Sequence, residues 1–274
     1  MDIEKQDKMI MADWQLQELL RMDRKRALAL YLTGSLGQVY LTCLAVWLLG
    51  RIGIATGYSS FAGWTAIGIG GTSSALWGIV TVNKYKVISL KTVLRDFFYI
   101  KQGPVDYLLV FTFLALNFVH VLIGGQFQIN IWYLPLALFL KALVFGGIEE
   151  IGWRYAFQPI LEEKVPYIIA TVLTFMTWGI WHFAFFYIDG SLGDMSVATG
   201  SHFCLSLLVN SFVLSALYHK TNSLWICAMT HAMINVCSQL AVGGNQFVLY
   251  GCQAIILVLA ILLSMKNKHQ PSLL

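Results

Sequence analysis

The chain alternates long apolar runs with short polar connections. A helix needs roughly 20 apolar residues to cross a hydrocarbon core about 30 Å thick, and runs of this kind recur along the whole sequence. They cover approximately residues 27–50, 54–82, 104–124, 131–158, 166–188, 197–218, 222–241 and 246–265. The pattern predicts an all-α, polytopic membrane helix bundle with about eight transmembrane helices.

Composition agrees with this interpretation. Hydrophobic residues make up 58% of the chain, charged residues only 12%, and the mean hydropathy is +0.68, whereas a soluble domain carries about 25% charged residues. The five cysteines show no CxxC spacing, which favours packing roles over disulfides or zinc ligands. We expect the lipid bilayer as a partner and no nucleic acid, because the net charge of +4 is explained by where the basic residues fall.

Basic residues are concentrated in every second connection. The N-terminal segment, the connections after the second, fourth and sixth predicted helices and the C-terminus carry Lys5, Lys8, Arg21, Arg24, Lys25, Arg26, Lys84, Lys86, Lys91, Arg95, Lys101, Lys164, Lys220, Lys266 and Lys268. The alternate connections hold only Arg51. Cytoplasmic loops are enriched in Lys and Arg, so the pattern predicts a multi-pass protein with both termini in the cytoplasm, in the plasma membrane if the host is bacterial.

The same pattern divides the chain into four parts. They are a cytoplasmic N-terminal segment (1–26), accessory helices (27–130), a catalytic core (131–241), and a last helix with a cytoplasmic tail (242–274). Within the accessory part, apolar residues recur at helical spacing among basic ones near residues 86–100. This pattern suits an amphipathic helix on the cytoplasmic leaflet, although a basic loop that only sets topology explains it equally well.

Two adjacent glutamates lie inside an apolar run. Ionisable groups at that depth are costly unless they are paired or used, so they mark a candidate functional site. On a helix Glu150 and Arg154 are i and i+4 and share a face, while Glu149 is turned about 100° away. We therefore expect Arg154 to hold Glu150, and Glu149 to point into a cavity as a general base. Lys141 lies two turns earlier, where it pairs with a carboxylate or extends to the interface, and no catalytic role is assigned to it.

Three further polar residues lie at similar depth in later apolar segments. His182 follows Trp178 by one turn, and His231 precedes Asn235 by one turn. A rise of about 1.5 Å per residue places all of them near the middle of the bilayer. Each of them alone is explained by polar contacts between helices; their combination with Glu149 indicates a buried hydrolytic site.

These residues fall into three motifs: EEIGWR (149–154), WGIWH (178–182) and HAMIN (231–235). The set resembles the E-E-x-x-x-R, F-x-x-x-H and H-x-x-x-N motifs of the CPBP (Abi) family of intramembrane proteases, which includes the type II CAAX prenyl endopeptidases. The resemblance covers roughly residues 131–241. One departure is Trp178, which stands where the family has Phe.

The resemblance implies a role for each matching residue. The position of Glu149 matches the catalytic glutamate, and that of His182 its partner in activating water. His231 and Asn235 match the pair that stabilises the oxyanion, as two donors one turn apart are suited to do. Glu150 and Arg154 match the supporting ion pair.

A bound metal is an alternative to a metal-free mechanism. Glu149, His182 and His231 offer ligands that suit Zn²⁺ with an open fourth position, but the chain has no HExxH motif. A metal-free glutamate mechanism is slightly favoured over zinc.

We expect an intramembrane endopeptidase that cleaves a peptide or lipidated protein substrate, of the prenylated CAAX type or the bacteriocin or pheromone type, in a cavity that opens towards the cytoplasm. One alternative is a catalytically silent membrane scaffold or bacteriocin self-immunity protein of the same fold. A second is an ion-coupled transporter with Glu149 and Glu150 as a proton relay. The absence of a detectable repeat counts against the transporter.

Overall fold

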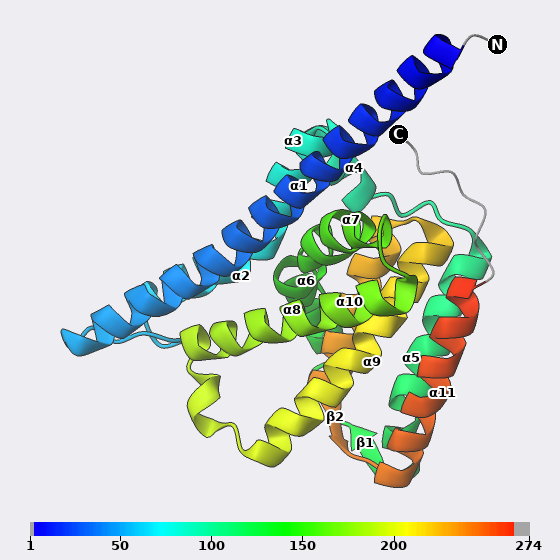
Figure 1. Cartoon of the computed structure of the whole chain (residues 1–274). Coiled ribbons are helices and arrows are strands. Elements are labelled where there is room, and N and C mark those ends of the chain that lie inside the picture. The colour runs from blue at the N-terminus through cyan, green and yellow to red at the C-terminus, as the bar shows by residue number, and fades with distance from the viewer. Residues whose placement is uncertain (1–2, 266–274) are drawn as a thin grey trace.

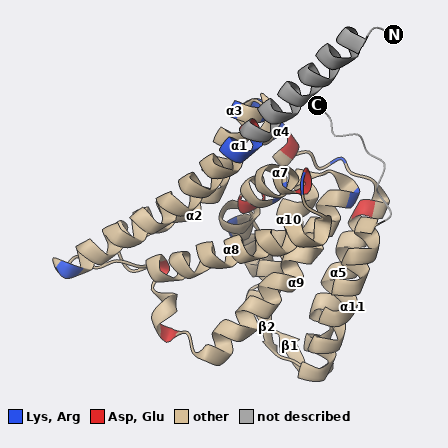
Figure 2. Cartoon of the chain, viewed as in Figure 1, with Lys and Arg blue, Asp and Glu red and all other residues tan. Residues whose placement is uncertain are grey.

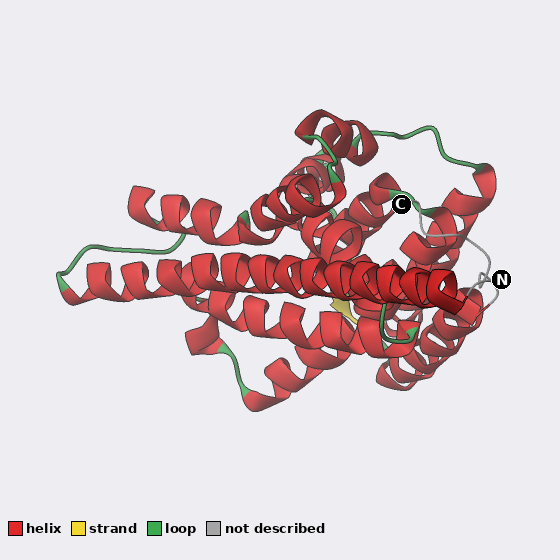
Figure 3. Cartoon of the chain, turned by 45° about the horizontal axis from the view of Figure 1, so that its top comes forward, coloured by secondary structure: helices red, strands yellow, loops and turns green. Residues whose placement is uncertain are grey.

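The fold is a bundle of long helices that run back and forth (Figure 1). The computed structural model describes residues 3–265, and the side chains of residues 23–265. Nearly all of this part is helical (Figure 3), which confirms the all-α prediction. The predicted tail after residue 265 lies outside the described residues.

Eight apolar helical segments correspond one by one to the eight predicted spans. Among the described residues, six are long and apolar enough to cross a membrane: Asp23–Arg51, Phe61–Lys86, Pro104–Gly124, Tyr167–Asp189, Val197–Thr221 and Gln246–Met265. Two shorter ones are Leu134–Gly147 and Leu224–Leu240. The chain is thus a polytopic membrane helix bundle, as predicted.

The helices are numbered as in Figure 1. The long ones are α1 (Ile3–Arg51), α2 (Phe61–Gly71), α3 (Ser73–Lys86), α5 (Pro104–Gly124), α6 (Leu134–Ala142), α8 (Tyr167–Asp189), α9 (Val197–Thr221), α10 (Leu224–Leu240) and α11 (Gln246–Met265). The short ones are α4 (Leu90–Phe97), α7 (Gln158–Glu162) and the 3-10 turn η3 (Ser191–Asp194). The second span is built from α2 and α3. It begins later than the predicted residue 54, at the Ser60 N-cap, whose side chain accepts a hydrogen bond from the Gly63 amide.

Two features were weakly marked in the sequence or not at all. The amphipathic segment predicted near 86–100 forms α4, which buries Val93 and Phe97 and exposes Lys91 and Arg95. A short antiparallel pair, β1 (Gly125–Phe127) with β2 (Ala241–Gly243), joins two connections at one end of the bundle. These strands are too short to give an alternating pattern of apolar and polar residues.

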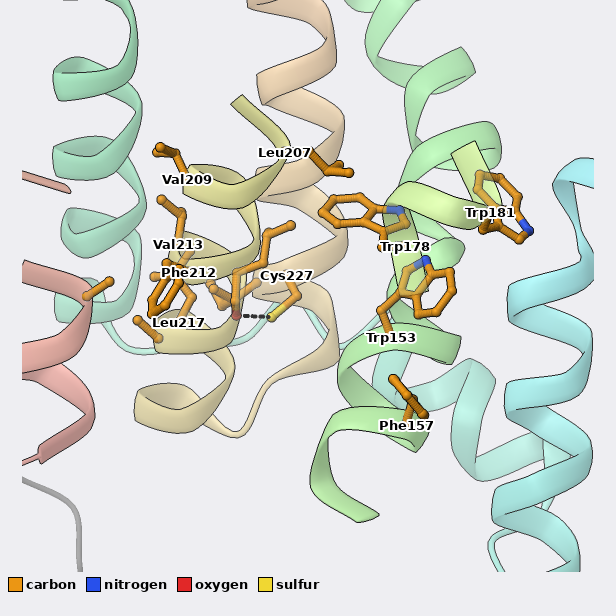
Figure 4. Close-up of a cluster of buried hydrophobic side chains, with 14 of the residues drawn as sticks. Trp153, Phe157, Trp178, Trp181, Leu207, Val209, Phe212, Val213, Leu217 and Cys227 are labelled. Carbon is orange, nitrogen blue, oxygen red and sulfur yellow. Dashed lines mark hydrogen bonds between the residues drawn. The ribbon is translucent and has the colours of Figure 1, made fainter. Parts of the chain in front are cut away.

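The core at the centre of the bundle is rich in aromatic residues (Figure 4). Trp153, Trp178 and Trp181 are almost fully buried, and Trp153 lies within 6.5 Å of each of the other two between ring centroids. The five cysteines are free thiols, of which Cys227 is buried. The aromatic core surrounds the candidate site.

Candidate active site

The two glutamates lie in a helical segment with unusual geometry. Between α6 and α7 the chain forms two stretches of π-helix, η1 (Leu143–Gly147) and η2 (Ile151–Phe157), and Glu149 and Glu150 lie between them. π-helical turns are rare and often occur at functional sites. The sequence predicted a regular α-helix here, because apolar periodicity does not distinguish single wide turns.

Glu149 is held by aromatic donors. Its Oε2 accepts a hydrogen bond from the Trp178 indole Nε1 at 2.7 Å and a longer one from Trp153 Nε1 at 3.4 Å. The Ser74 hydroxyl donates to the Glu149 backbone carbonyl at 3.2 Å, which ties α3 to the same residue. The side chain is 5% exposed and borders a cavity. The structure thus places Glu149 on the cavity wall.

Glu150 points to other partners, as the spacing predicted. Its Oε2 lies 3.5 Å from Arg154 Nε in a fully buried ion pair. Its Oε1 accepts a hydrogen bond from His231 Nδ1 at 2.7 Å. This second contact was not foreseen, because sequence spacing relates residues within one helix and His231 comes from α10. Glu150 therefore supports Arg154 and orients His231.

Arg154 is held on three sides. Besides Glu150, its Nη2 donates to the Ser211 hydroxyl at 3.2 Å, and its guanidinium lies 4.6 Å from the centre of the Trp178 ring. The latter distance is that of a cation–π contact. A carboxylate, a hydroxyl and an aromatic face thus stabilise the buried charge, while Nε and Nη1 form no hydrogen bond with the described residues.

His231 and Asn235 address one point next to Gly146. A Cβ atom built on Gly146 would lie 2.5 Å from Asn235 Nδ2 and 3.1 Å from His231 Nε2. These two polar atoms therefore converge, as their i and i+4 spacing predicted. Gly146 was not selected from the sequence; its lack of a side chain leaves the space that the two atoms occupy.

His182 lies on the same cavity. Its Nδ1 donates to the Trp178 carbonyl at 3.0 Å, which leaves Nε2 as the ring nitrogen available to the cavity. Among the described residues, no direct hydrogen bond joins His182 to Glu149. The two side chains border a shared space instead, so a small molecule such as water is needed to connect them.

The cavity has a volume of about 440 Å³. Glu149, His182 and Asn235 form its inner wall together with Gly146 and Trp181. Towards its mouth it is bordered by Tyr58, Trp64, Lys141, Asp189 and Gln239. Lys141 is exposed and forms no ion pair with the described carboxylates, which fits the second of its two expected roles, extension to the interface.

The candidate ligands for zinc are the side chains of Glu149, His182 and His231. Their chemistry suits zinc, because each imidazole has Nδ1 engaged by an oxygen and Nε2 left over, as in many zinc sites. Their arrangement does not, since within residues 23–265 no three His, Cys, Asp or Glu side chains are grouped closely enough to hold a metal ion.

Trp178 contributes more than the packing role assigned from the sequence. It donates to Glu149, lies under Arg154, and has its ring centroid 5.3 Å from that of His182 and 5.4 Å from that of His231. Its place in the second motif, where the family pattern has Phe, was the signal available. An indole adds an N–H that a phenyl ring lacks.

Comparison with known families agrees with the site. Residues 130–237 match the family model described as Type II CAAX prenyl endopeptidase Rce1-like. This segment contains Glu149, His182, His231 and Asn235. The match falls on the same part of the chain as the three motifs and confirms the resemblance to the type II CAAX prenyl endopeptidases drawn from them.

The chain is also similar to a curated relative, CAAX prenyl protease 2 of Methanococcus maripaludis. The two are 28% identical over 123 residues, which make up 43% of this chain and 44% of that protein. The aligned part is thus less than half the length of the relative.

Proposed function

We propose that this protein is an intramembrane endopeptidase that hydrolyses a peptide bond of a membrane-associated substrate. The observation that carries the proposal is the arrangement around one cavity: the Glu149 carboxylate and the His182 imidazole border it, and the His231 and Asn235 nitrogens converge beside it at Gly146. A base, a second proton acceptor and two oxyanion donors are the groups that acyl transfer to water requires.

The first step activates water. Glu149 Oε2 is engaged by the two indole N–H groups, and Oε1 makes no hydrogen bond to the described residues. A water molecule between Oε1 and His182 Nε2 loses one proton to Glu149 as its oxygen attacks the carbonyl carbon of the peptide. The carbonyl π electrons move to the carbonyl oxygen and give a tetrahedral oxyanion.

The second step stabilises and resolves this intermediate. The oxyanion accepts hydrogen bonds from Asn235 Nδ2 and from His231 Nε2, which requires His231 to carry protons on both ring nitrogens. The Glu150 carboxylate, 2.7 Å from Nδ1, balances that charge. As the C–N bond breaks, Glu149 returns its proton to the leaving amine and the oxyanion closes to a carboxylic acid. The remaining acid proton passes to the amine, so the products are a carboxylate and an ammonium group.

The competing mechanism uses zinc, because the side chains of Glu149, His182 and His231 are of the types that bind it. Bound zinc would supply a Lewis acid. A chelator distinguishes the two. The metal-free mechanism predicts that the purified enzyme retains its activity after prolonged treatment with 1,10-phenanthroline and EDTA.

The proposal is tested with purified protein in liposomes. The probes are membrane-anchored reporter peptides, including a farnesylated peptide that ends in C-a-a-X. Glu149→Gln and His182→Ala are expected to abolish cleavage, whereas Glu163→Gln, which only removes a surface ion pair with Arg24, retains it. Cleavage at equal rates by wild type and both site variants would refute the proposal and favour the silent scaffold.

A further inference from the structure

The mouth of the cavity lies at one definite end of the bundle. Tyr58 is in the connection between α1 and α2, Asp189 is the last residue of α8, and Gln239 is one residue before the end of α10. Gly57 lies next to the Asp189 carbonyl, since a Cβ built on it would be 3.7 Å from that oxygen. The β1–β2 pair joins the two remaining connections of this end. The mouth residues therefore share one face of the protein.

Basic residues gather at the opposite end (Figure 2). This end is formed by the start of α1, α4 and its flanking segments, the connection between α7 and α8, the connection between α9 and α10, and the end of α11. The Lys and Arg residues with described side chains at this end are Arg24, Lys25, Arg26, Lys84, Lys86, Lys91, Arg95, Lys101, Lys164 and Lys220. The side-chain pairs Arg24–Glu163 and Tyr155–Asp96 hold its elements together.

The mouth end has a different charge. This end has four connections, residues 51–60, 125–133, 190–196 and 241–245. Arg51 is the one Lys or Arg residue in them. Lys141 borders the cavity on α6. Asp194 and the α8 terminus at Asp189 add negative charge there. Lys and Arg in short loops determine which end stays in the cytoplasm, and their distribution here is strongly one-sided.

We propose that the catalytic cavity opens on the non-cytoplasmic face of the membrane, and that its substrate is an exported or membrane-tethered peptide presented from that side. The expectation of cytoplasmic termini and the expectation of a cavity that opens towards the cytoplasm are incompatible, because the structure puts the mouth and the chain ends at opposite ends. The distribution of Lys and Arg favours cytoplasmic termini, and the proposal therefore takes the opposite direction for the cavity.

The depth of the cavity restricts the substrate further. His182 lies seven residues, roughly 10 Å, from the end of α8 at a rise of about 1.5 Å per residue. An extended chain advances about 3.3–3.6 Å per residue. The substrate therefore needs an unfolded stretch of about three residues between the surface and the bond to be cleaved. A folded domain does not enter a space of about 440 Å³.

Single-cysteine labelling tests the side of the mouth without any need for activity. In a variant whose five native cysteines are replaced, one cysteine is introduced by Asp194→Cys at the mouth end or by Lys101→Cys at the basic end, both exposed positions. With a membrane-impermeant maleimide, we expect Asp194→Cys to be labelled in intact cells and Lys101→Cys only after permeabilisation. The reverse pattern, or equal labelling of both, would overturn the proposal.

The substrate part rests on the proposed function and has its own test. A reporter with its cleavable stretch on the outer face is compared with the same stretch on the cytoplasmic face, including a form that ends in C-a-a-X, each with wild type and Glu149→Gln. Only the outer reporter is expected to be cleaved, and only by wild type. Cleavage of the cytoplasmic reporter would overturn the inference. No cleavage of either reporter, together with the expected labelling, would refute the proposed function and leave the orientation standing.

Discussion

Trp178→Phe isolates one hydrogen bond of the site. The substitution removes the indole N–H that donates to Glu149 Oε2 at 2.7 Å and keeps an aromatic ring against Arg154, His182 and His231. Phe is also the residue of the family motif at this position. The backbone and the surrounding packing are therefore expected to accept it.

The magnitude follows from the chemistry of the bond. A hydrogen bond to a charged group contributes about 1.5–3 kcal/mol, and each ~1.4 kcal/mol in a barrier is a factor of ten in rate. The 3.4 Å contact from Trp153 remains and replaces little of it. We expect kcat to fall roughly 10- to 100-fold. KM should change little, because the lost donor contacts the base and not the substrate.

The assay is reporter-peptide cleavage in liposomes over a range of substrate concentrations, with thermal unfolding measured in parallel. Trp225→Phe is the matched control: it removes an indole N–H that donates to the Tyr107 hydroxyl at 3.2 Å, away from the cavity. Wild-type kcat in a folded Trp178→Phe variant would refute the reasoning. So would an equal loss of kcat in both variants.

Three further substitutions test neighbouring parts of the site. Gly146→Ala places a methyl group 2.5 Å from Asn235 Nδ2; we expect at least a tenfold loss of kcat in a folded protein, and normal kcat would exclude this convergence of donors as the oxyanion site. Glu150→Gln leaves the buried charge of Arg154 without its carboxylate and should cost about 3–5 kcal/mol of stability, seen as a lower unfolding temperature; an unchanged temperature contradicts the ion pair. Gly152→Ala meets the Ser74 hydroxyl and backbone and should lower stability by about 1–3 kcal/mol, an effect absent from Gly193→Ala, where a Cβ has open space.

The eight spans and the direction of each glutamate were predictable from the sequence. Spans depend on local hydropathy over about 20 residues, and Glu150 faces Arg154 because both lie on one helical segment. Helix spacing also sufficed for His231 and Asn235, which lie one turn apart.

Contacts between helices were not predictable in this way. The Trp178–Glu149 bond joins α8 to the glutamate segment, and the His231–Glu150 bond joins it to α10. Each depends on the packing of helices that are 29 and 81 residues apart in the chain. No periodicity within one helix carries that information. The residues that border the cavity are set by the same contacts, because they come from several helices.

The two glutamates divide the work through these contacts. Glu150 is fully buried, and its carboxylate contacts Arg154 and His231 and holds both side chains in place. Glu149 has one oxygen engaged by indoles, which donate but carry no charge to neutralise it. Glu149 thus keeps its second oxygen free to contact water, whereas Arg154 and His231 occupy the two oxygens of Glu150. The two adjacent glutamates therefore have different chemical roles because their partners differ. Trp178 connects the two sets of partners, since its N–H contacts Glu149 while the face of its ring contacts Arg154.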